Sequence, residues 1–307
     1  MTTFEPLVFS KFHGLGNDFV IIDCSAGAGA EAQRWLPDSD CKAICDRNFG
    51  VGADGVIMYA AVDKNACSFE MRIVNGDGSV AQMCGNGIRC LAQHLANTGA
   101  PRSLRILTGA GVISTEVISP GSVAVNMGEP RLMATDVPML LTAGSTSGMA
   151  LDCPIVALGE FLSISAISMG NPHGVIFVDD LDNLLSTGSL DRLGPALSAH
   201  AMFPDGANIE FVEVLNPKCV KMVVWERGSG RTLACGTGAC AVVVAGVLTD
   251  RLERKCDVLL EGGTLDIEWK GASTEQGSAS CVFKTGPAHE VFRGNLCSDW
   301  FRQRAAW

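Results

Sequence analysis

The sequence predicts an α/β protein of two similar domains, because one order of landmarks runs through the chain twice. A cysteine followed by Gly-x-Gly and a long apolar run occurs at Cys84 and again at Cys235, 151 residues later. Three further landmarks repeat in the same order at offsets of 151 to 154 residues: Asn75 with Glu226, Gly16-Asn17 with Gly170-Asn171, and Gly52-Ala53 with Gly206-Ala207. Such a long repeat, in which strands alternate with helices, is typical of two related α/β domains.

The first half of the chain is predicted to hold seven strands and two helices. Apolar segments bounded by glycine, asparagine and aspartate predict strands at 7–12, 19–23, 56–60, 68–74, 104–108, 112–118 and 123–127. An aspartate N-cap signal followed by a helical pattern predicts a helix over 38–46. The second helix follows Cys84, because polar side chains lie off its apolar face.

The second half repeats this order. Strands are expected at 161–169, 175–178, 209–215, 221–225, 258–260, 264–269 and 281–284, and a helix at 190–200. The β-branched run Val242–Val244 would by itself fit a strand as well as a helix. We assign a helix after Cys235 because the corresponding run after Cys84 is helical in pattern.

Composition narrows the class of protein. The chain has 307 residues, of which 47% are apolar and 18% charged, which is enough to bury sizeable cores. A net charge of −10 argues against a nucleic-acid partner. No apolar stretch approaches the ~18 residues of a membrane span, and no signal peptide is visible. We therefore expect a small-molecule partner, no nucleic acid, no membrane, and a cytoplasmic location, or the plastid stroma if a transit peptide has been removed.

Cysteine and histidine usage bears on redox state and metals. There are thirteen cysteines and no Cys-x-x-Cys pair, which favours reduced thiols in a cytosol-like compartment. None of the five histidines lies in a tight cluster with cysteines, so no metal site is expected.

The two cysteines that begin the repeated helices are the candidate catalytic groups. A helix N-terminus carries unpaired N–H groups and a positive dipole end, which lower a thiol pKa and bind a carboxylate. Inverting an α-carbon needs a base on one face and an acid on the other, and a thiolate and a thiol supply that pair. We therefore expect Cys84 and Cys235 to flank one substrate carbon, while Cys90 and Cys240, further along, are core residues.

Five segments of the chain resemble a known family. They are Phe12–Phe19, Met83–Gly87, Met169–His173, Trp225–Gly228 and Ala234–Cys240, and together they resemble diaminopimelate epimerase over nearly the whole chain. Gly50–Gly55 and Ala234–Cys240 look most like the plant and cyanobacterial branch.

The resemblance implies a fold and an activity. The fold would be two pseudo-symmetric domains, each a curved sheet wrapped around a central helix: an N-terminal lobe of residues 1–126 plus 286–307 with Cys84, and a C-terminal lobe of residues 127–285 with Cys235. The activity would be epimerisation of LL-2,6-diaminopimelate to meso-diaminopimelate in lysine biosynthesis, by two thiols and without pyridoxal phosphate or another cofactor. A homodimer is left open.

The resemblance also implies roles for individual residues. Cys84 and Cys235 would be the acid–base pair, and His173 and Glu226 would tune the thiols. The substrate would be bound by Asn17, Asn75, Gly85, Asn86, Asn171, Asn208, Glu226, Arg227, Gly236 and Thr237. Some family members have a glutamine that touches substrate at the position of Gly55, and this glycine cannot make that contact.

Two other functions compete with this interpretation. A proline or hydroxyproline racemase would share the fold and the two thiols, but would not need Arg227 and several asparagines for a second amino-acid end. A thiol redox protein is the alternative from another class, although it would favour a Cys-x-x-Cys pair. The Gly-x-Gly-x-x-Gly match at Gly50–Gly55 leads into a strand, so it does not predict a dinucleotide site.

Overall fold

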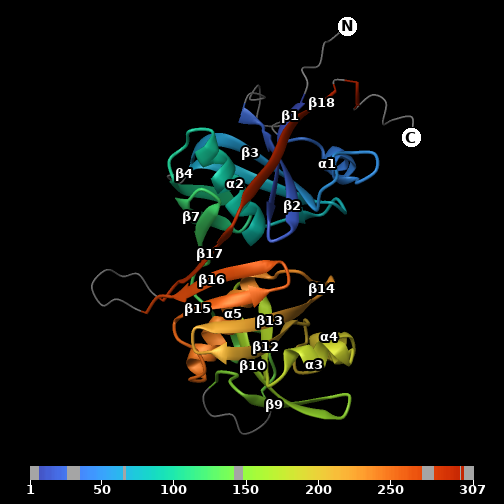
Figure 1. The fold of residues 1–307 in the computed structure, drawn as a ribbon, viewed down its shortest axis with the longest axis vertical. Helices are drawn as coiled ribbons and strands as arrows, with labels where there is room; N and C mark the ends of the chain where they lie inside the picture. The colour runs from blue at the N-terminus through green and yellow to red at the C-terminus, as the bar shows by residue number, and fades with distance from the viewer. Residues whose placement is uncertain are drawn as a thin grey trace. The chain divides into compact units, whose positions relative to one another are not determined.

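The fold is that of a computed structural model, which describes residues 7–25, 35–64, 67–141, 148–271, 280–297 and 299–300 (Figure 1). The chain forms two compact units, Met1–Val125 with Gly286–Trp307, and Asn126–Thr285. The outer ends of the predicted N-terminal lobe, 1–6 and 301–307, lie outside the described residues.

The first unit contains a sheet and two helices. Its helices are α1 (Asp38–Cys45) and α2 (Gly85–Asn97). Its strands are β1 (Leu7–Gly14), β2 (Asn17–Asp23), β3 (Gly55–Lys64), β4 (Cys67–Asn75), β5 (Val80–Ala81), β6 (Ser103–Thr108), β7 (Gly111–Ser119), β8 (Ser122–Asn126) and β18 (His289–Leu296).

The second unit contains a matching set. Its helices are η3 (Ala134–Asp136), α3 (Leu181–Ser186), α4 (Ser189–Ser198) and α5 (Gly236–Leu248). Its strands are β9 (Cys153–Ala157), β10 (Glu160–Ser168), β11 (Pro172–Val178), β12 (Asn208–Asn216), β13 (Cys219–Glu226), β14 (Gly230–Thr232), β15 (Lys255–Leu260), β16 (Gly263–Trp269) and β17 (Val282–Pro287).

The strands pair in the same way in both units. In the first unit β2–β3 and β4–β6 are parallel, while β1–β2, β3–β4, β4–β5 and β6–β7 are antiparallel. In the second unit β11–β12 and β13–β15 are parallel, while β10–β11, β12–β13, β13–β14 and β15–β16 are antiparallel. The repeat read in the sequence is therefore a repeat of topology.

One helix is enclosed by strands in each unit. In α2 every residue from Asn86 to Leu95 is buried, and in α5 every residue from Gly238 to Gly246 is buried. The strands that pack on α2 include β1, β2, β7 and β18, and those that pack on α5 include β10, β11, β12, β15 and β16. Helix α5 is apolar on all sides, as is typical of an enclosed helix, and this explains how its β-branched run fits a helix. Helix α2 differs, because it also buries Arg89, Gln93 and His94, which the sequence pattern places off its apolar face.

The other face of each sheet carries a second core. In the first unit α1 contributes Cys41, Ile44 and Cys45 to a cluster with residues of β1 to β4. In the second unit α3 and α4 contribute Leu181, Leu190, Leu193 and Leu197 to a cluster with β9 to β13. Each sheet is thus fixed between a central helix and outer helices, which holds the strand ends and the start of the central helix in place.

The structure also differs from the predicted elements. Helix α1 begins after Pro37, which makes no side-chain cap, so the expected aspartate N-cap is wrong. The helix expected at 190–200 is preceded by the six-residue α3, capped by Asp180, which accepts from the backbone of Asn183 at 2.7 Å. Strands β9 and β18 were not predicted, and they hold equivalent positions: β9 pairs with β10, and β18 pairs with β1. Within the described residues, no helix has both the length and the apolarity to cross a membrane.

Candidate active site

The candidate catalytic group of the first unit lies at the start of α2. Cys84 is the N-cap of this helix in an extended conformation, and its sulfur accepts a hydrogen bond from the backbone N–H of Gly87 at 3.5 Å. The same sulfur lies 3.8 Å from Oδ1 of Asn17, at the start of β2. A half-buried thiol at a helix N-terminus, beside a polar side chain, is what a thiol acid–base group requires.

The carboxamide of Asn17 is fixed by two neighbours. Its Nδ2 donates to Oδ2 of Asp54 at 2.8 Å, and its Oδ1 accepts from Nδ2 of Asn86 at 3.2 Å. Asn86 is fixed in turn by Arg89, whose Nη2 donates to its Oδ1 at 2.9 Å. The structure therefore brings together Cys84, Gly85, Asn86 and Asn17.

Asn75 lies elsewhere in the same unit, at the end of β4. It pairs across the strands with Gly55, and its Nδ2 donates to Oγ of Ser79 at 3.0 Å. None of the hydrogen bonds of the described residues joins Asn75 directly to Cys84 or Asn17, so its role in substrate binding stays a prediction.

The candidate catalytic group of the second unit lies at the start of α5. Cys235 is the N-cap of this helix, and its sulfur accepts from the backbone N–H of Gly238 at 3.4 Å. Its sulfur also lies 3.5 Å from Oγ1 of Thr237. Cys84 and Cys235 thus share one local geometry, as the repeat predicts.

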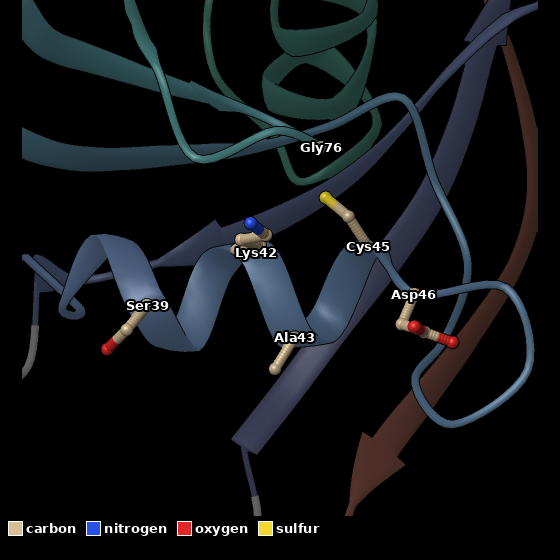
Figure 2. A pocket seen from close by; sticks show the side chains of 6 residues that line it. All are labelled: Ser39, Lys42, Ala43, Cys45, Asp46 and Gly76. Carbon is tan, nitrogen blue, oxygen red and sulfur yellow. The ribbon is translucent and has the colours of Figure 1, made fainter.

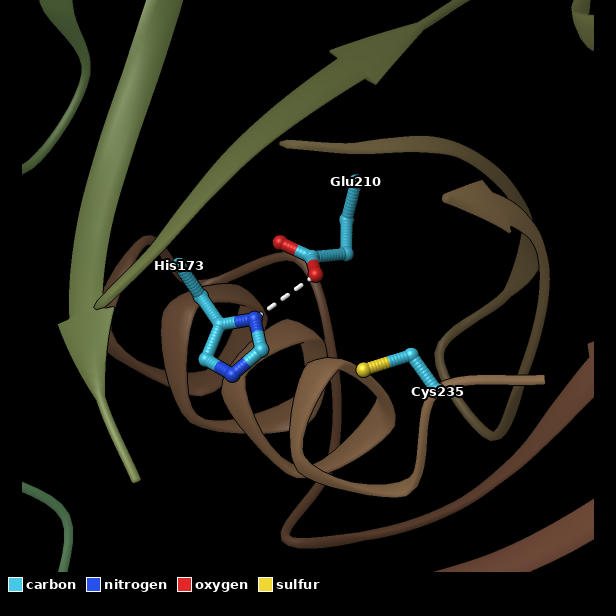
Figure 3. Close-up of side chains that lie close together, drawn as sticks. All are labelled: His173, Glu210 and Cys235. Carbon is cyan, nitrogen blue, oxygen red and sulfur yellow. Dashed lines mark hydrogen bonds and ion pairs between the residues drawn. The ribbon is translucent and has the colours of Figure 1, made fainter. Parts of the chain in front are cut away.

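A buried acid and a buried imidazole accompany Cys235 (Figure 3). His173 on β11 and Glu210 on β12 are both fully buried, and Nδ1 of the histidine lies 2.7 Å from Oε1 of the glutamate. Polar ligand atoms of these two residues and the Cys235 sulfur all lie within 4.8 Å of one another. Strands β11 and β12 therefore place a hydrogen-bonded imidazole and carboxyl group beside this sulfur.

The surroundings of Cys235 raise the pKa of its thiol. Burial is the largest cause, and the negative charges of Glu226 and Glu210 add to it, against weaker opposing hydrogen bonds from Thr237 and Gly238. The expectation that the helix N-terminus lowers the pKa of this thiol is therefore wrong for the structure without substrate. Desolvation by burial, together with the nearby carboxylates, outweighs the effect of the helix dipole on this thiol.

The other predicted residues of the second unit form two hydrogen-bonded groups. Asn171 contacts Nε2 of His173 through Oδ1 at 3.1 Å, and its Nδ2 donates to Oγ1 of Thr237 at 3.4 Å. Asn208 is buried and accepts from the backbone N–H of Arg227 at 2.8 Å, and its Nδ2 donates to the carbonyl of Pro172 at 3.2 Å.

Glu226 and Arg227 end strand β13. Glu226 accepts a hydrogen bond from the hydroxyl of Thr232, and burial raises its own pKa despite that bond. The Arg227 guanidinium donates a hydrogen bond from Nη1 to the carbonyl of Asp205 at 2.6 Å. This bond fixes the planar, forked cation just beyond the end of β13. Such a fork can bind a carboxylate with two parallel hydrogen bonds.

The trio of His173, Glu210 and Cys235 offers nitrogen, oxygen and sulfur ligands of the kind that zinc binds. In a tetrahedral site with bonds near 2.0–2.1 Å, two ligand atoms would lie roughly 3.3 Å apart. The 2.7 Å separation of Nδ1 and Oε1 is that of a charge-assisted hydrogen bond instead. The arrangement therefore fits a shared proton better than a metal ion.

The first unit also has a pocket of about 320 Å³, lined by Ser39, Lys42, Ala43, Cys45, Asp46 and Gly76 (Figure 2). It holds no residue of the predicted site. Burial, reinforced by the nearby Asp18 and Asp54, raises the pKa of the Cys45 thiol to about 11. Cys45 is therefore a weak nucleophile at neutral pH.

Sequence reasoning missed three residues that position the site. Asp54 and Arg89 fix Asn17 and Asn86, and Glu210 pairs with His173. The signal for Glu210 was an acid directly between Ile209 and Phe211 in a mostly apolar strand, where a buried carboxylate needs a partner. No comparable pattern marks Asp54.

The comparisons with known proteins agree with these motifs. The family model described as diaminopimelate epimerase matches residues 9–133 and 165–291. The chain is 44% identical to a diaminopimelate epimerase of Synechocystis over 94% of this chain and 98% of that one. It is also 44% identical to a chloroplastic diaminopimelate epimerase of rice, over 95% of this chain and 80% of that one.

A solved structure supports the fold independently. A hydroxyproline epimerase from Agrobacterium vitis superposes with a TM-score of 0.61 at 13% identity, covering 96% of this chain and 92% of that one. The family model spans both cysteine helices, and the relatives match over nearly the whole chain. The predicted resemblance and fold class are confirmed, and this chain belongs to the diaminopimelate epimerase family.

Proposed function

We propose that Cys84 and Cys235 are the two acid–base groups with which this protein epimerises LL-2,6-diaminopimelate to meso-diaminopimelate. The matched geometry of the two thiols carries the proposal. Each is the N-cap of an enclosed helix, and each sulfur accepts from the N–H three residues on, at 3.5 Å for Cys84 and 3.4 Å for Cys235. Two equivalent thiols suit a reaction in which a proton leaves one face of a carbon and arrives at the other.

The reaction needs no more than proton transfer and charge stabilisation. One sulfur, as a thiolate, takes the α-proton, and the other, as a thiol, gives a proton to the opposite face. Because the roles exchange in the reverse direction, the pair must carry one proton between them in either direction. The half-buried Cys84 and the fully buried Cys235 give that pair unequal surroundings.

The helix starts can hold the reacting carboxylate. The first N–H groups of a helix have no partner within it, and they favour a negative charge. Gly85 and Asn86 begin α2, and Gly236 and Thr237 begin α5. The negative charge that spreads onto the carboxylate when the α-proton leaves would be stabilised by these donors.

The second amino-acid end of the substrate calls for a different set of groups. A zwitterion needs a carboxylate partner and an ammonium partner. Arg227 supplies a planar fork for the carboxylate. Glu226 and the carboxamides of Asn75, Asn171 and Asn208 supply acceptors and donors for the ammonium and the remaining oxygens.

The test is an assay with LL-diaminopimelate beside L-proline and trans-4-hydroxy-L-proline, with no cofactor added. We expect turnover of diaminopimelate alone. Turnover of the proline substrates in its place would support the racemase alternative. A protein that turns over none of them but exchanges disulfides would be the thiol redox protein instead.

We further propose that the protein works in the cytoplasm, or in the plastid stroma as a mature enzyme. The Synechocystis relative is bacterial and the rice relative is described as chloroplastic. A homodimer is tested by the mass of the protein in solution with static light scattering: a mass of about twice 32.2 kDa supports it, and a mass near 32.2 kDa contradicts it.

A further inference from the structure

Glu210 is a buried acid that the two-thiol chemistry does not use directly. It lies on β12 between β11 and β13, is fully buried, and points at the first turn of α5. A Cβ added to Gly238 would lie 2.5 Å from its Oε1, so the glycine leaves the space that the carboxylate occupies. A carboxylate this deeply buried is costly unless it is paired.

Its partner is His173, and the pairing determines the protons on the ring. Nδ1 lies 2.7 Å from Oε1 of Glu210, and Nε2 lies 3.1 Å from Oδ1 of Asn171. Both ring nitrogens thus face oxygen acceptors, and a ring that donates from both nitrogens is an imidazolium. An imidazolium buried at this position would have its charge balanced by a Glu210 carboxylate.

The ring is linked to the sulfur through two side chains. With Oδ1 of Asn171 turned to the ring, its Nδ2 donates to Oγ1 of Thr237 at 3.4 Å. The Thr237 oxygen then accepts from Asn171, and its own hydrogen is free to point at the Cys235 sulfur, 3.5 Å away. A hydroxyl that donates to sulfur stabilises the thiolate more than the thiol.

We propose that Glu210 is a positioning residue for Cys235, and that it acts by keeping His173 doubly protonated. Through Asn171, the protonated ring directs the Thr237 hydroxyl toward the Cys235 sulfur. This assignment rests on the proposed role of Cys235 as an acid–base group and adds a residue that sets when it becomes a thiolate.

With a neutral His173 ring, the hydrogen bonds between the ring and Cys235 would run in the opposite direction, and Glu210 prevents this. A neutral ring with hydrogen on Nδ1 would need a donor at Nε2, so the Asn171 carboxamide would turn over. Its oxygen would then accept from Thr237, and the Cys235 thiol would donate to the Thr237 oxygen. Protonation of His173 is therefore linked to the proton on Cys235, with thiolate favoured when the ring is charged.

The test can separate this role from a direct charge effect of Glu210 on Cys235. The two predict changes of opposite sign in the reactivity of Cys235 when Glu210 is replaced. A negative charge near a thiol, acting alone, disfavours the thiolate, and that direct effect is part of why the pKa of Cys235 is raised. Glu210→Gln would then make Cys235 more reactive. If Glu210 acts through His173, the same change removes the imidazolium and makes Cys235 less reactive.

Other ionisable groups near Cys235 are unchanged in this comparison. Glu226 on β13 adds a negative charge, and its burial raises its own pKa. Lys284 on β17 is fully buried and lies against Gly236, where an added Cβ would clash with its Nζ. Both are present in the parent and in the variant, so a difference between the two reports on Glu210 and His173.

The experiment measures the rate at which iodoacetamide alkylates Cys235, followed on its peptide by mass spectrometry from pH 6 to 10 without substrate. Losing an opposite charge close to an ionisable group shifts its pKa by roughly 1–3 units. We expect Glu210→Gln to slow alkylation near pH 7.5 by about tenfold or more. Glu213→Gln, on the same strand, is the matched control and should leave the profile unchanged, since Glu213 accepts from the backbone of Leu181 instead.

A second measurement does not depend on the variant folding. Nitrogen-15 spectra of the parent protein, assigned with His173→Gln, should show hydrogen on both ring nitrogens of His173 near pH 7.5. A neutral ring in the parent, or alkylation that is unchanged or faster in folded Glu210→Gln, would overturn the assignment. Neither measurement uses turnover, so failure here is distinct from failure of the proposed activity.

Discussion

Arg89 is a fully buried cation one turn into α2, and its contacts explain why it is there. Its guanidinium donates to the carbonyl of Gly85 at 3.2 Å, to the carbonyl of Pro287 at 3.3 Å and to Oδ1 of Asn86 at 2.9 Å. It therefore fixes the Asn86 carboxamide, which donates to Asn17 beside the Cys84 sulfur.

Replacing this cation should cost both stability and activity. Arg89→Met keeps most of the apolar volume but leaves three acceptors without these donors, at about 1–3 kcal/mol for each one that stays unsatisfied. We expect the urea midpoint to fall sharply and kcat to fall with it. Arg293→Met is the matched control, because the exposed Arg293 side chain pairs with Glu290 at the surface, where such pairs contribute little to stability. Equal losses in the two variants would contradict this role of Arg89.

Asp18 belongs to an ion-pair network that links the 47–54 loop to Asn17, beside Cys84. It binds Lys11 at 2.5 Å and Arg47 at 2.9 Å, and Arg47 also binds Asp54, which holds Asn17. Burial alone would raise the pKa of Asp18, but the hydrogen bonds from Arg47 and Lys11 outweigh it and lower the pKa from 3.8 to about 2.

This shift predicts a pH dependence of stability. A carboxyl whose pKa is lower in the folded state stabilises the fold while it is ionised, so the contribution is present above about pH 4 and is lost as the pH falls toward 2. We expect the free energy of unfolding, from urea titrations at pH 5.5 and pH 3, to fall further in the parent than in Asp18→Asn. Parallel losses in the two proteins would show that Asp18 does not contribute in this range.

Among individual residues, the sequence predicted those that occur in motifs and missed those that hold the motif residues in place. Cys84 and Cys235 stand beside glycines in a repeated pattern, and both occupy the N-cap positions predicted for them. Asp54 and Glu210 each contact a side chain 37 residues away, and such contacts exist only once the sheet has formed. Arg89 contacts Asn86 within α2, but its contact with the carbonyl of Pro287 spans 198 residues. The raised pKa of Cys235 was missed for the same reason, since burial was not visible in the sequence.

The two cysteine helices differ in what their third residue packs against. At Gly87 an added Cβ would meet the Cδ1 methyl of Ile57 at 3.0 Å, and at Gly238 it would meet the Glu210 carboxylate at 2.5 Å. The first neighbour is the end of a flexible side chain. The second is a buried group held by His173.

A matched pair of substitutions should therefore behave differently. Alanine is favoured over glycine in helices by up to ~1 kcal/mol, so Gly87→Ala should leave the melting temperature and kcat within a small range of the parent. Gly238→Ala forces the carboxylate to move, which we expect to cost roughly 1–3 kcal/mol and to lower kcat. If calorimetry and turnover show the two variants to be alike, the carboxylate is not confined as described.

Element prediction succeeded where a pattern was long and failed where it was short or polar. The 13-residue helices α2 and α5 were predicted, the second only through its likeness to the first. The six-residue α3 offers less than two turns of pattern. Strand β18 has the sequence HEVFRGNL, in which four of the eight residues are polar and five are exposed, so no apolar alternation marks it as a strand.

The whole molecule repeats one design, and the repeat explains the pair of thiols. Equivalent strands pair in the same sense in both units, and in each unit the enclosed helix begins at a cysteine N-cap. The landmarks recur at offsets of 151 to 154 residues, and this nearly constant spacing predicted the correspondence of the two units. Long insertions between structural elements would have changed the spacing.

The measurement that tests the two-thiol account most directly is epimerisation in heavy water, starting from LL-diaminopimelate. Each thiol exchanges its hydrogen with solvent, so the thiol that gives the new hydrogen carries deuterium. We predict that the meso product gains deuterium at the inverted carbon from the first turnovers, while the unreacted LL substrate stays unlabelled early in the reaction. Product that keeps its original hydrogen, or substrate and product that gain label together from the start, would contradict it.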